Sequence, residues 1–309
     1  LDNLKLADMP KPAPAAGEVL VEGRAAGLNP SDAKNVCGRF PYTTVPRTPG
    51  RDFAGIVVEG PSHLIGRSVW GTGKELGFTR DGSHAAFITL PAEGAAPMPK
   101  ALSFAQAASC GVPYTTAWDA LERCAVRAGL KFLVIGAGAV GTAAIVLAKW
   151  LGAEVFVAVR RAEQAAQLRS ANLKVAQLDP AKQLSDVTKE ILPGGADVIF
   201  DTTGQWVPQT IAALSTFGRV AIIAAPADGH ANVPILAMYR KGGSLIGVNS
   251  LLHDSKTCAK MMAKMGEGFE SGALPKPTLR EWAFADALAA YHEVDKGARE
   301  KVVLTAMAG

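Results

Sequence analysis

With 309 residues, the chain is longer than a single hydrophobic core usually supports, so two domains are expected. Hydrophobic residues make up 49% of it and charged residues 19%, which fits a globular protein and excludes extended disorder. The net charge is only +4 and the basic residues are scattered, which disfavours nucleic acid or a membrane surface as a partner.

The first hundred residues are expected to form short β-strands punctuated by proline and glycine. This pattern is typical of a small barrel or sandwich with long loops, not of a parallel sheet. A Pro- and Ala-rich stretch leads into the strands, which are expected at 18–28, 53–59, 67–71 and 83–90.

From about residue 104 the hydrophobic pattern changes. Helices are expected over 104–110 and 115–129, and strands then alternate with helical stretches. Six strands separated by five helical or irregular crossovers predict a doubly wound parallel sheet. The strands are expected at 131–135, 154–159, 175–178, 197–201, 218–224 and 244–248, and the crossovers at 140–152, 162–171, 184–192, 206–217 and 233–242.

After Ser250 the alternation stops, and helices are expected at 253–271 and 284–297, followed by a strand at 300–307. This tail is too short to form a domain alone, so we expect it to return to the N-terminal β domain. The expected organisation is a first domain made of residues 1–107 and 251–309, with a nucleotide-binding domain of residues 108–250 inserted in it.

The cysteines and histidines indicate no metal or disulfide chemistry. The four cysteines lie far apart without a CxxC pair, which argues against a disulfide framework or a cysteine-rich zinc site and favours a reducing cytoplasm. The five histidines have no metal-binding spacing, and no GxSxG nucleophile motif occurs. The uncharged run 132–148 contains three glycines, which argues against a membrane span.

A glycine-rich loop follows the first strand of the predicted parallel sheet. Gly136, Gly138 and Gly141 have the GxGxxG spacing, and they lie between an apolar strand and a helix, as a dinucleotide-binding fingerprint requires. The first glycine permits the turn, the second lets the backbone approach a pyrophosphate, and the third allows close packing of helix and strand. The helix N-terminus then offers N–H donors to the phosphates.

Two adjacent arginines end the second strand of this sheet. An NAD-binding protein often has an acidic residue there to accept hydrogen bonds from the ribose, but Arg160 and Arg161 carry only donors. Guanidinium groups suit a ribose 2′-phosphate, so the pair predicts NADPH as cofactor. The alternative is that one or both arginines are solvated charges at a strand end.

Several motifs together resemble the medium-chain dehydrogenase/reductase superfamily, and within it the zinc-independent quinone oxidoreductase (zeta-crystallin-like) branch. They are GEVLVEGRAAGLNPSDAKNVCG (17–38), TPGRDFAGIVVEG (48–60), DGSHAAFITLP (81–91), YTTAWDAL (114–121), the glycine loop, DTTG (201–204) and EKVVL (300–304). The resemblance implies an α/β protein with a GroES-like β-barrel catalytic domain and an inserted Rossmann domain. It also implies a homodimer formed through the sixth strand of the Rossmann sheet.

The resemblance places Asn29 and Arg51 where the zinc-dependent relatives have a cysteine and a histidine that hold the catalytic metal. Arginine is not a zinc ligand, and the four-cysteine lobe for a structural zinc is also missing, so no metal is expected. Alcohol oxidation without a Lewis acid is difficult. Reduction of a quinone or an α,β-unsaturated carbonyl needs mainly cofactor positioning and a place for developing negative charge.

The resemblance also implies the site residues. Asn29 and Asp32 are expected at the interdomain cleft near the nicotinamide ribose, although Asp32 has the alternative role of capping the following turn. Thr116 is expected to contact the cofactor from the other side. The remaining expected cofactor contacts are Ala139 and Val140 in the glycine loop, Thr202 and Thr203 after the fourth strand, Ala225 and Pro226 after the fifth, Asn249 and Ser250 after the sixth, and Lys301 in the last strand.

The expected proton donor is less well defined. Enoyl thioester reductases of this branch use a tyrosine eleven residues after the asparagine, and that position is Phe40 here. Tyr42 is the candidate substitute, with loop packing as its alternative role, and solvent is the alternative source of the proton. The sequence therefore predicts an NADPH-dependent reductase of quinones or conjugated carbonyls. The alternatives are an enoyl reductase, a zinc-free alcohol dehydrogenase, or a non-catalytic NADPH-binding protein.

Overall fold

The computed structural model describes Leu1 and residues 3–306, which divide into two compact units. Unit one comprises Leu1–Thr115 and Ser250–Gly309, and unit two comprises Thr116–Asn249. The chain enters unit two within helix α2 (Phe104–Arg123), whereas the sequence places the first domain border after residue 107.

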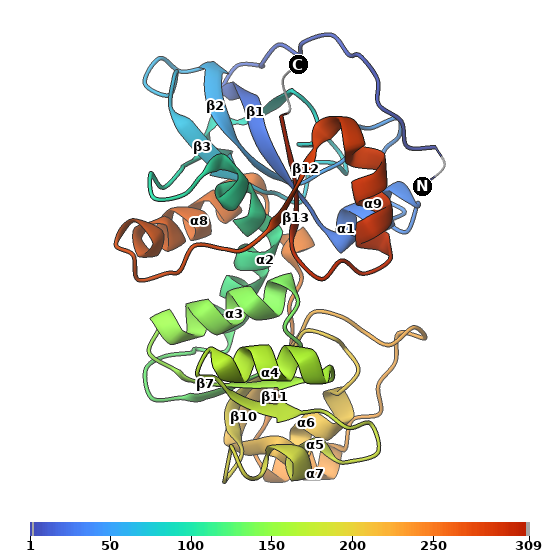
Figure 1. The fold of residues 1–309 in the computed structure, drawn as a ribbon, viewed down its shortest axis with the longest axis vertical. Helices are drawn as coiled ribbons and strands as arrows, with labels where there is room; N and C mark the ends of the chain where they lie inside the picture. Colours follow the sequence, from blue (N-terminus) through green and yellow to red (C-terminus); the bar gives the residue numbers. More distant parts are fainter. Residues whose placement is uncertain (2, 307–309) are drawn as a thin grey trace. The chain divides into compact units, whose positions relative to one another are not determined.

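Unit one is built on a mixed sheet of seven strands (Figure 1). The strand order is β12-β13-β1-β2-β3-β5, and β4 pairs with β1. All pairings are antiparallel except the parallel pair of β12 and β13. The strands are β1 (Glu18–Leu28), β2 (Asp52–Glu59), β3 (Ser68–Gly71), β4 (Phe87–Pro91), β5 (Ala96–Pro97), β12 (Arg280–Ala283) and β13 (Val302–Thr305).

Strand β1 is the centre of this unit. Its N-terminal half pairs with β4 and its C-terminal half with β13, while β2 runs along the other edge. The pairing of Leu28 with Val302 brings the C-terminal tail back to the N-terminal sheet, as expected. The helices of this unit are α1 (Pro30–Val36), α8 (Ser255–Glu270) and α9 (Ala287–Asp295), with short 3-10 turns η1 (Ala92–Gly94), η2 (Ser250–Leu252) and η3 (Phe284–Asp286).

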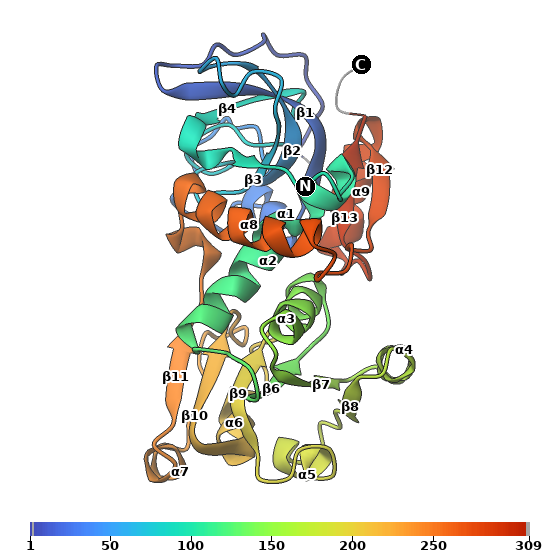
Figure 2. The ribbon, with the colours of Figure 1, turned by 90° about the vertical axis from the view of Figure 1, so that its left-hand side faces the viewer.

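Helix α9 lies beside α1 (Figure 1) and beside β13 (Figure 2), and it closes one apolar cluster of unit one. Its buried Tyr291 faces His84, whose Nδ1 lies 2.7 Å from the tyrosine oxygen. Burial lowers the pKa of His84 to about 4, so the ring is neutral at physiological pH. The histidine is therefore a structural link between the 83–84 loop and α9.

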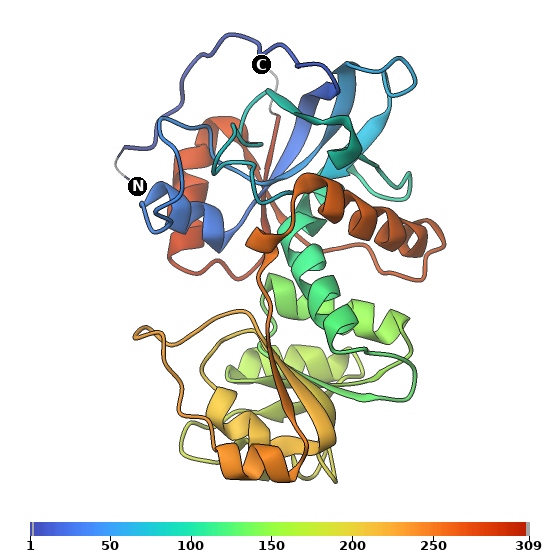
Figure 3. The same ribbon diagram turned by 180° about the vertical axis from the view of Figure 1, so that it is seen from behind.

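Unit two is a doubly wound parallel sheet (Figure 3). The strand order is β11-β10-β9-β6-β7-β8, every pairing is parallel, and the order reverses between β6 and β9. Ligands of such sheets bind at this reversal point, outside the carboxyl ends of the strands. The strands are β6 (Lys131–Ile135), β7 (Glu154–Val159), β8 (Lys174–Gln177), β9 (Ala196–Asp201), β10 (Leu214–Ile222) and β11 (Ser244–Gly247).

The helices of unit two are α3 (Ala139–Trp150), α4 (Ala162–Ser170), α5 (Leu184–Thr188), α6 (Val207–Ala213) and α7 (Ile235–Arg240). Leu133, Ile135 and Phe156 belong to the core between sheet and helices. None of the helices in the described residues is long and apolar enough to cross a membrane. All four cysteines are free thiols, as their spacing predicts.

The structure differs from the sequence expectation in several places, and three of these differences have a clear physical reason. The two helices expected at 104–110 and 115–129 form one helix, α2, because nearly every residue on both sides of Pro113 is buried and packing overrides the proline. The helix expected over 206–217 ends at Ala213, since buried Leu214 already pairs with Ala196 in the sheet. Strand β12 was not expected, because it depends on pairing with β13, which no local pattern indicates.

Candidate functional site

The glycine loop of unit two has the geometry of a phosphate cradle. Gly136 has a φ of +91°, and a Cβ there would lie 2.6 Å from Thr202 Oγ1. A Cβ at Gly141 would overlap the carbonyl oxygen of Gly136, so helix and strand pack closely only with glycine. At Gly138, the N-cap of α3, a Cβ would meet nothing within 4 Å, which leaves the backbone open to a ligand. These three glycines therefore fit a dinucleotide pyrophosphate, with Ala139 and Val140 opening the helix.

The DTTG segment is held in place beside this loop by a buried carboxylate. Asp201 Oδ1 accepts hydrogen bonds from the Thr203 backbone N–H and hydroxyl, both at 2.8 Å, and Oδ2 accepts from the Trp206 N–H at 2.9 Å. Thr202 Oγ1 donates to the Ile135 carbonyl at 2.7 Å. Both threonine hydroxyl protons are thus used within the protein. Sequence analysis missed Asp201, although it opens the quoted motif.

Arg160 and Arg161 remain available to a ligand. Arg160 follows the last residue of β7 and Arg161 is the N-cap of α4; both are exposed. Across the described residues, neither guanidinium has a hydrogen-bond or ion-pair partner. The start of α4 contacts the glycine loop, because Gln164 Nε2 donates to the Ala137 carbonyl at 2.9 Å. Two unpaired cations therefore lie next to the phosphate cradle.

The other predicted contacts of unit two come from helix α2 and from the segments that follow strands β10 and β11. Thr116 is buried, and its hydroxyl has no hydrogen-bond partner in the described residues. Gly204, after β9, approaches the next loop so closely that a Cβ there would lie 2.7 Å from the Ala225 nitrogen. Ala225 therefore lies against the DTTG segment, and Pro226 is the next residue of this loop. Asn249 is exposed at the end of the unit.

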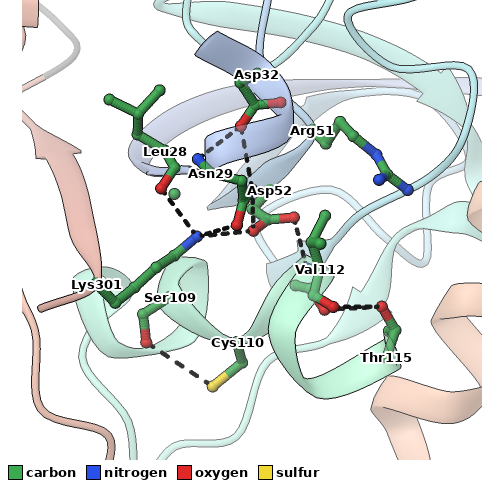
Figure 4. Close-up of polar contacts among 12 residues, drawn as sticks. Leu28, Asn29, Asp32, Arg51, Asp52, Ser109, Cys110, Val112, Thr115 and Lys301 are labelled. Carbon is green, nitrogen blue, oxygen red and sulfur yellow. Dashed lines mark hydrogen bonds and ion pairs between the residues drawn. The ribbon is translucent and has the colours of Figure 1, made fainter. Parts of the chain in front are cut away.

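In unit one, four polar side chains form a buried cluster, which we call the Asn29 network: Asn29, Asp32, Asp52 and Lys301 (Figure 4). Asn29 is the N-cap of α1, Asp52 is the first residue of β2, and Lys301 precedes β13. Asn29 Nδ2 donates to Asp52 Oδ2 at 2.8 Å and to Asp32 Oδ2 at 3.1 Å. Sequence analysis missed Asp52. The feature that could have identified it is its position directly after Arg51 in the GRDF segment of a quoted family motif.

Lys301 uses its whole ammonium group inside this network. Its Nζ donates to Asn29 Oδ1 at 2.5 Å, to Asp52 Oδ2 at 3.2 Å and to the Leu28 carbonyl at 3.3 Å. The lysine side chain is 7% exposed and that of Asp52 is 0% exposed. A contact between Lys301 and a cofactor stays a prediction, because all three protons have partners here.

Asp32 is the group with the most unusual environment. Its Oδ2 accepts the Asn29 backbone N–H at 2.8 Å, which is the capping geometry considered as its alternative role, and its Oδ1 has no partner in the described residues. Burial, reinforced by the neighbouring Asp52 carboxylate, raises the pKa of Asp32 to about 6, although Asn29, Lys301 and Arg51 oppose the shift. Its contact with a cofactor stays a prediction, since only 1% of the residue is exposed.

Arg51 is a second buried cation of unit one. Its Nε donates to the Gly73 carbonyl at 3.0 Å, and its two Nη atoms donate to the Ser250 hydroxyl at 3.0 Å and the Ser250 carbonyl at 3.2 Å. Ser250, an expected cofactor contact, is thus engaged by Arg51. A guanidinium offers only donors, so this position does not fit a metal. No group of three or more His, Cys, Asp or Glu suited to a metal ion occurs in residues 1 and 3–306.

Tyr42 belongs to an aromatic cluster above Arg51. Its ring stacks on Phe78 with 5.7 Å between centroids, and the Arg51 guanidinium lies 5.9 Å from the Phe78 centroid. The tyrosine is 50% exposed, whereas Phe78 is buried. Burial raises the pKa of Tyr42 against the opposing charge of Arg51, so the hydroxyl keeps its proton at neutral pH. Loop packing and proton donation are both compatible with this position.

Comparison with known protein families gives two matches along the chain. The family model described as "Alcohol dehydrogenase GroES-like domain" matches residues 15–100. The model described as "Zinc-binding dehydrogenase" matches residues 139–267. The first match covers strands of unit one, and the second begins at the helix that follows the glycine loop.

Three curated proteins are similar to the chain. A "zinc-type alcohol dehydrogenase-like protein" of Schizosaccharomyces pombe is 37% identical, with 87% of this chain and 81% of that protein covered. The "NADPH-dependent alkenal/one oxidoreductase, chloroplastic" of Arabidopsis thaliana is 36% identical, but only 60% of this chain and 50% of that protein are covered. The human "quinone oxidoreductase" is 28% identical, with 97% of this chain and 93% of that protein covered.

We predict that Asp32 gives stability a pH dependence of unusual sign. Because its pKa rises from 3.8 to about 6 on folding, its contribution is fully present below pH 4 and is lost as the pH rises through 6. The difference in unfolding free energy between the wild type and Asp32→Asn should fall by on the order of 2 kcal/mol from pH 4 to pH 7. Urea denaturation across this range measures it.

The matched control is Asp254→Asn. Hydrogen bonds from Thr257 lower the pKa of Asp254, so its contribution is present above pH 4 and is lost only at lower pH. The difference in unfolding free energy between the wild type and Asp254→Asn should therefore not change from pH 4.5 to 7. If the difference for Asp32→Asn does not change with pH either, the raised pKa of Asp32 is contradicted.

Proposed function

The chain belongs to the medium-chain dehydrogenase/reductase superfamily, and from this premise we propose that it is a zinc-independent, NADPH-dependent reductase of quinones or α,β-unsaturated carbonyls. Members of this superfamily are oxidoreductases that use a nicotinamide cofactor. The observation that carries the proposal is the open glycine cradle with two unpaired arginines beside it. A nicotinamide cofactor supplies the hydride in such reactions.

The residues of unit two fit this cofactor. The N–H groups at the start of α3 bind the phosphates, and Gly138 admits the pyrophosphate to the backbone. Arg160 and Arg161 bind the ribose 2′-phosphate, whose negative charge an acidic residue at this place would repel. The buried, unpartnered hydroxyl of Thr116 gains a hydrogen-bond partner on the cofactor. The name of the Arabidopsis relative, which includes NADPH, agrees with this choice.

The choice of acceptor follows from the lack of fit to zinc. The resemblance places Arg51 where zinc-dependent relatives have a metal-binding histidine. Its guanidinium is bonded to Gly73 and Ser250 and offers only donors, so it does not fit a metal ion. Without a Lewis acid the carbonyl to be reduced must already be electron-poor, as in a quinone or an enone. These are the acceptor classes that the names of the human and Arabidopsis relatives state.

Within unit one we assign roles to two residues. Asn29 contacts the bound ligands, held by the network around it. Tyr42 supplies the proton that follows hydride addition to an enone, because its hydroxyl is protonated at neutral pH and half of the residue is exposed. A quinone needs this donor less, since its hydroquinone anion is already stabilised.

The test of the function is the rate of NADPH and NADH oxidation by purified protein with quinones, enones, enoyl thioesters and simple aldehydes. We expect turnover of quinone or enone with NADPH, no turnover of simple aldehydes, and the same rates after dialysis against a chelator. Aldehyde reduction that the chelator abolishes would establish a zinc alcohol dehydrogenase instead. NADPH binding without turnover of any acceptor would favour a non-catalytic role.

The cofactor assignment makes a separate prediction. Replacing both Arg160 and Arg161 with alanine removes charge-assisted hydrogen bonds that only the 2′-phosphate can accept, so the Kd of NADPH should rise by at least about tenfold. The Kd of NADH should stay nearly unchanged. Titration of each cofactor, followed by fluorescence, measures both constants. An equal loss for the two cofactors would mean that the arginines are structural.

We also propose that the protein is a homodimer paired through β11. This strand is the edge of the unit-two sheet and is bonded on one side to β10. Its Leu245 is exposed, as are Ile235 and Tyr239 of the preceding helix α7. Size-exclusion chromatography with light scattering should give a dimer for the wild type and a monomer for Leu245→Lys. Ile65→Lys, an exposed site of unit one, is the control that should stay dimeric. A monomeric wild type would refute the proposal.

A further inference from the structure

The Asn29 network fixes the orientation of one amide without ambiguity. Lys301 carries only donors, so the atom of Asn29 that faces it at 2.5 Å must be the carbonyl Oδ1. The Asp32 oxygen next to Asn29 also accepts the Asn29 backbone N–H, and the Asp52 oxygen also accepts from Lys301, so both oxygens act as acceptors and must face Nδ2. Each proton of Nδ2 then has its own carboxylate. A flipped amide would put a donor against the ammonium and an acceptor against both carboxylates.

The position of Asp52 is itself determined from several sides. Its Oδ1 accepts the Val112 backbone N–H at 2.8 Å, and its Oδ2 accepts from both Asn29 and Lys301. Glycines make the room for it: a Cβ at Gly111 would overlap the carboxylate, and a Cβ at Gly27 would lie 3.0 Å from the Asp52 Cβ and 3.1 Å from Lys301 Nζ. The carboxylate therefore has a single well-defined place between β1, β13 and α2.

We infer that Asp52 and Lys301 are a pair of positioning residues that hold the side-chain amide of Asn29 in one orientation, so that Asn29 meets a ligand only as a hydrogen-bond acceptor. Both Nδ2 protons are consumed by carboxylates, so Oδ1, which accepts from Lys301, is the side-chain atom of Asn29 left to face a ligand. A ligand group that contacts Asn29 must therefore bring a hydroxyl or an N–H.

Only one part of this inference rests on the proposed function, namely the effect that Asp52 and Lys301 have on the rate of the reaction. If Asn29 is an acceptor, it cannot donate to the negative charge that develops on a reduced quinone or enone. Asp52 and Lys301 then affect the reaction through Asn29, not by touching substrate. The positioning itself is a property of the folded protein and can be measured without any reaction.

The first arm of the test is hydrogen exchange of side-chain amides in protein labelled with [15N]asparagine. The chain has six asparagines, and the Asn29 signal is assigned by its loss in Asn29→Ala. We expect its two Nδ2 protons to exchange slowly in the wild type and roughly tenfold faster or more in Asp52→Asn. Lys301→Met, which removes the donor to Oδ1, should also speed exchange, and it carries the test if Asp52→Asn does not fold.

Two controls accompany this arm. The Asn35 amide is a control inside the same spectrum, since its Nδ2 donates to the Gly77 carbonyl at 2.7 Å without contact to Asp52, and its exchange should not change. Asp197→Asn is the control variant, because this carboxylate accepts bonds from Lys131 and Ser215 in unit two. Exchange at Asn29 that is equally fast in the wild type and in Asp52→Asn would overturn the inference.

The second arm is a double-mutant cycle on kcat with the acceptor that the wild type reduces. Asp52→Asn should lower kcat on the order of 10- to 100-fold in the wild-type background and have no further effect in Asn29→Ala. Equal losses in both backgrounds would show that Asp52 acts independently of Asn29, which would overturn the inference. If the wild type reduces no acceptor, the proposed function is wrong. The hydrogen-exchange experiment then tests by itself whether Asp52 and Lys301 position Asn29.

Discussion

The buried ion pair of Asp52 and Lys301 is the constraint on which unit one depends. Removing two charges from water costs several kcal/mol for each ion, and the pair is tolerated only if its remaining hydrogen bonds are made. Here they come from the Val112 N–H, the Asn29 amide and the Leu28 carbonyl. The end of β1, the start of β2, the edge of β13 and a turn of α2 must therefore keep one arrangement for the pair to exist.

Four cations named above differ in their surroundings between the two units. In unit one, Lys301 and Arg51 are buried and donate hydrogen bonds within the protein. They therefore tune their surroundings, most visibly by opposing the raised pKa of Asp32. In unit two, Arg160 and Arg161 are exposed and lack partners in the described part of the chain, so their charge is left for an anionic ligand.

Local sequence patterns predicted unit two well. Gly136 and Gly141 meet steric requirements that neighbouring residues impose, and alternating strands and helices admit few topologies besides a doubly wound sheet. Unit one was harder, because its strands pair across long stretches of chain. Strand β12 exists only through β13, and α2 continues through Pro113 only because it is buried. Asp52 was not predicted, because its partners Asn29, Val112 and Lys301 are all distant from it in the sequence.

The sequence by itself determined the kind of protein: a two-unit oxidoreductase of this superfamily, with a glycine loop followed by arginines where an acidic residue is common. Those features lie within short segments, so their chemistry can be recognised from residue type and spacing. Only the tertiary structure decided that Lys301 donates hydrogen bonds to Asn29 and Asp52, and that Asp32 is buried with a raised pKa. Lys301 and Asn29 are 272 positions apart, and a hydrogen bond over that separation is set by how the whole unit packs, which no local pattern encodes.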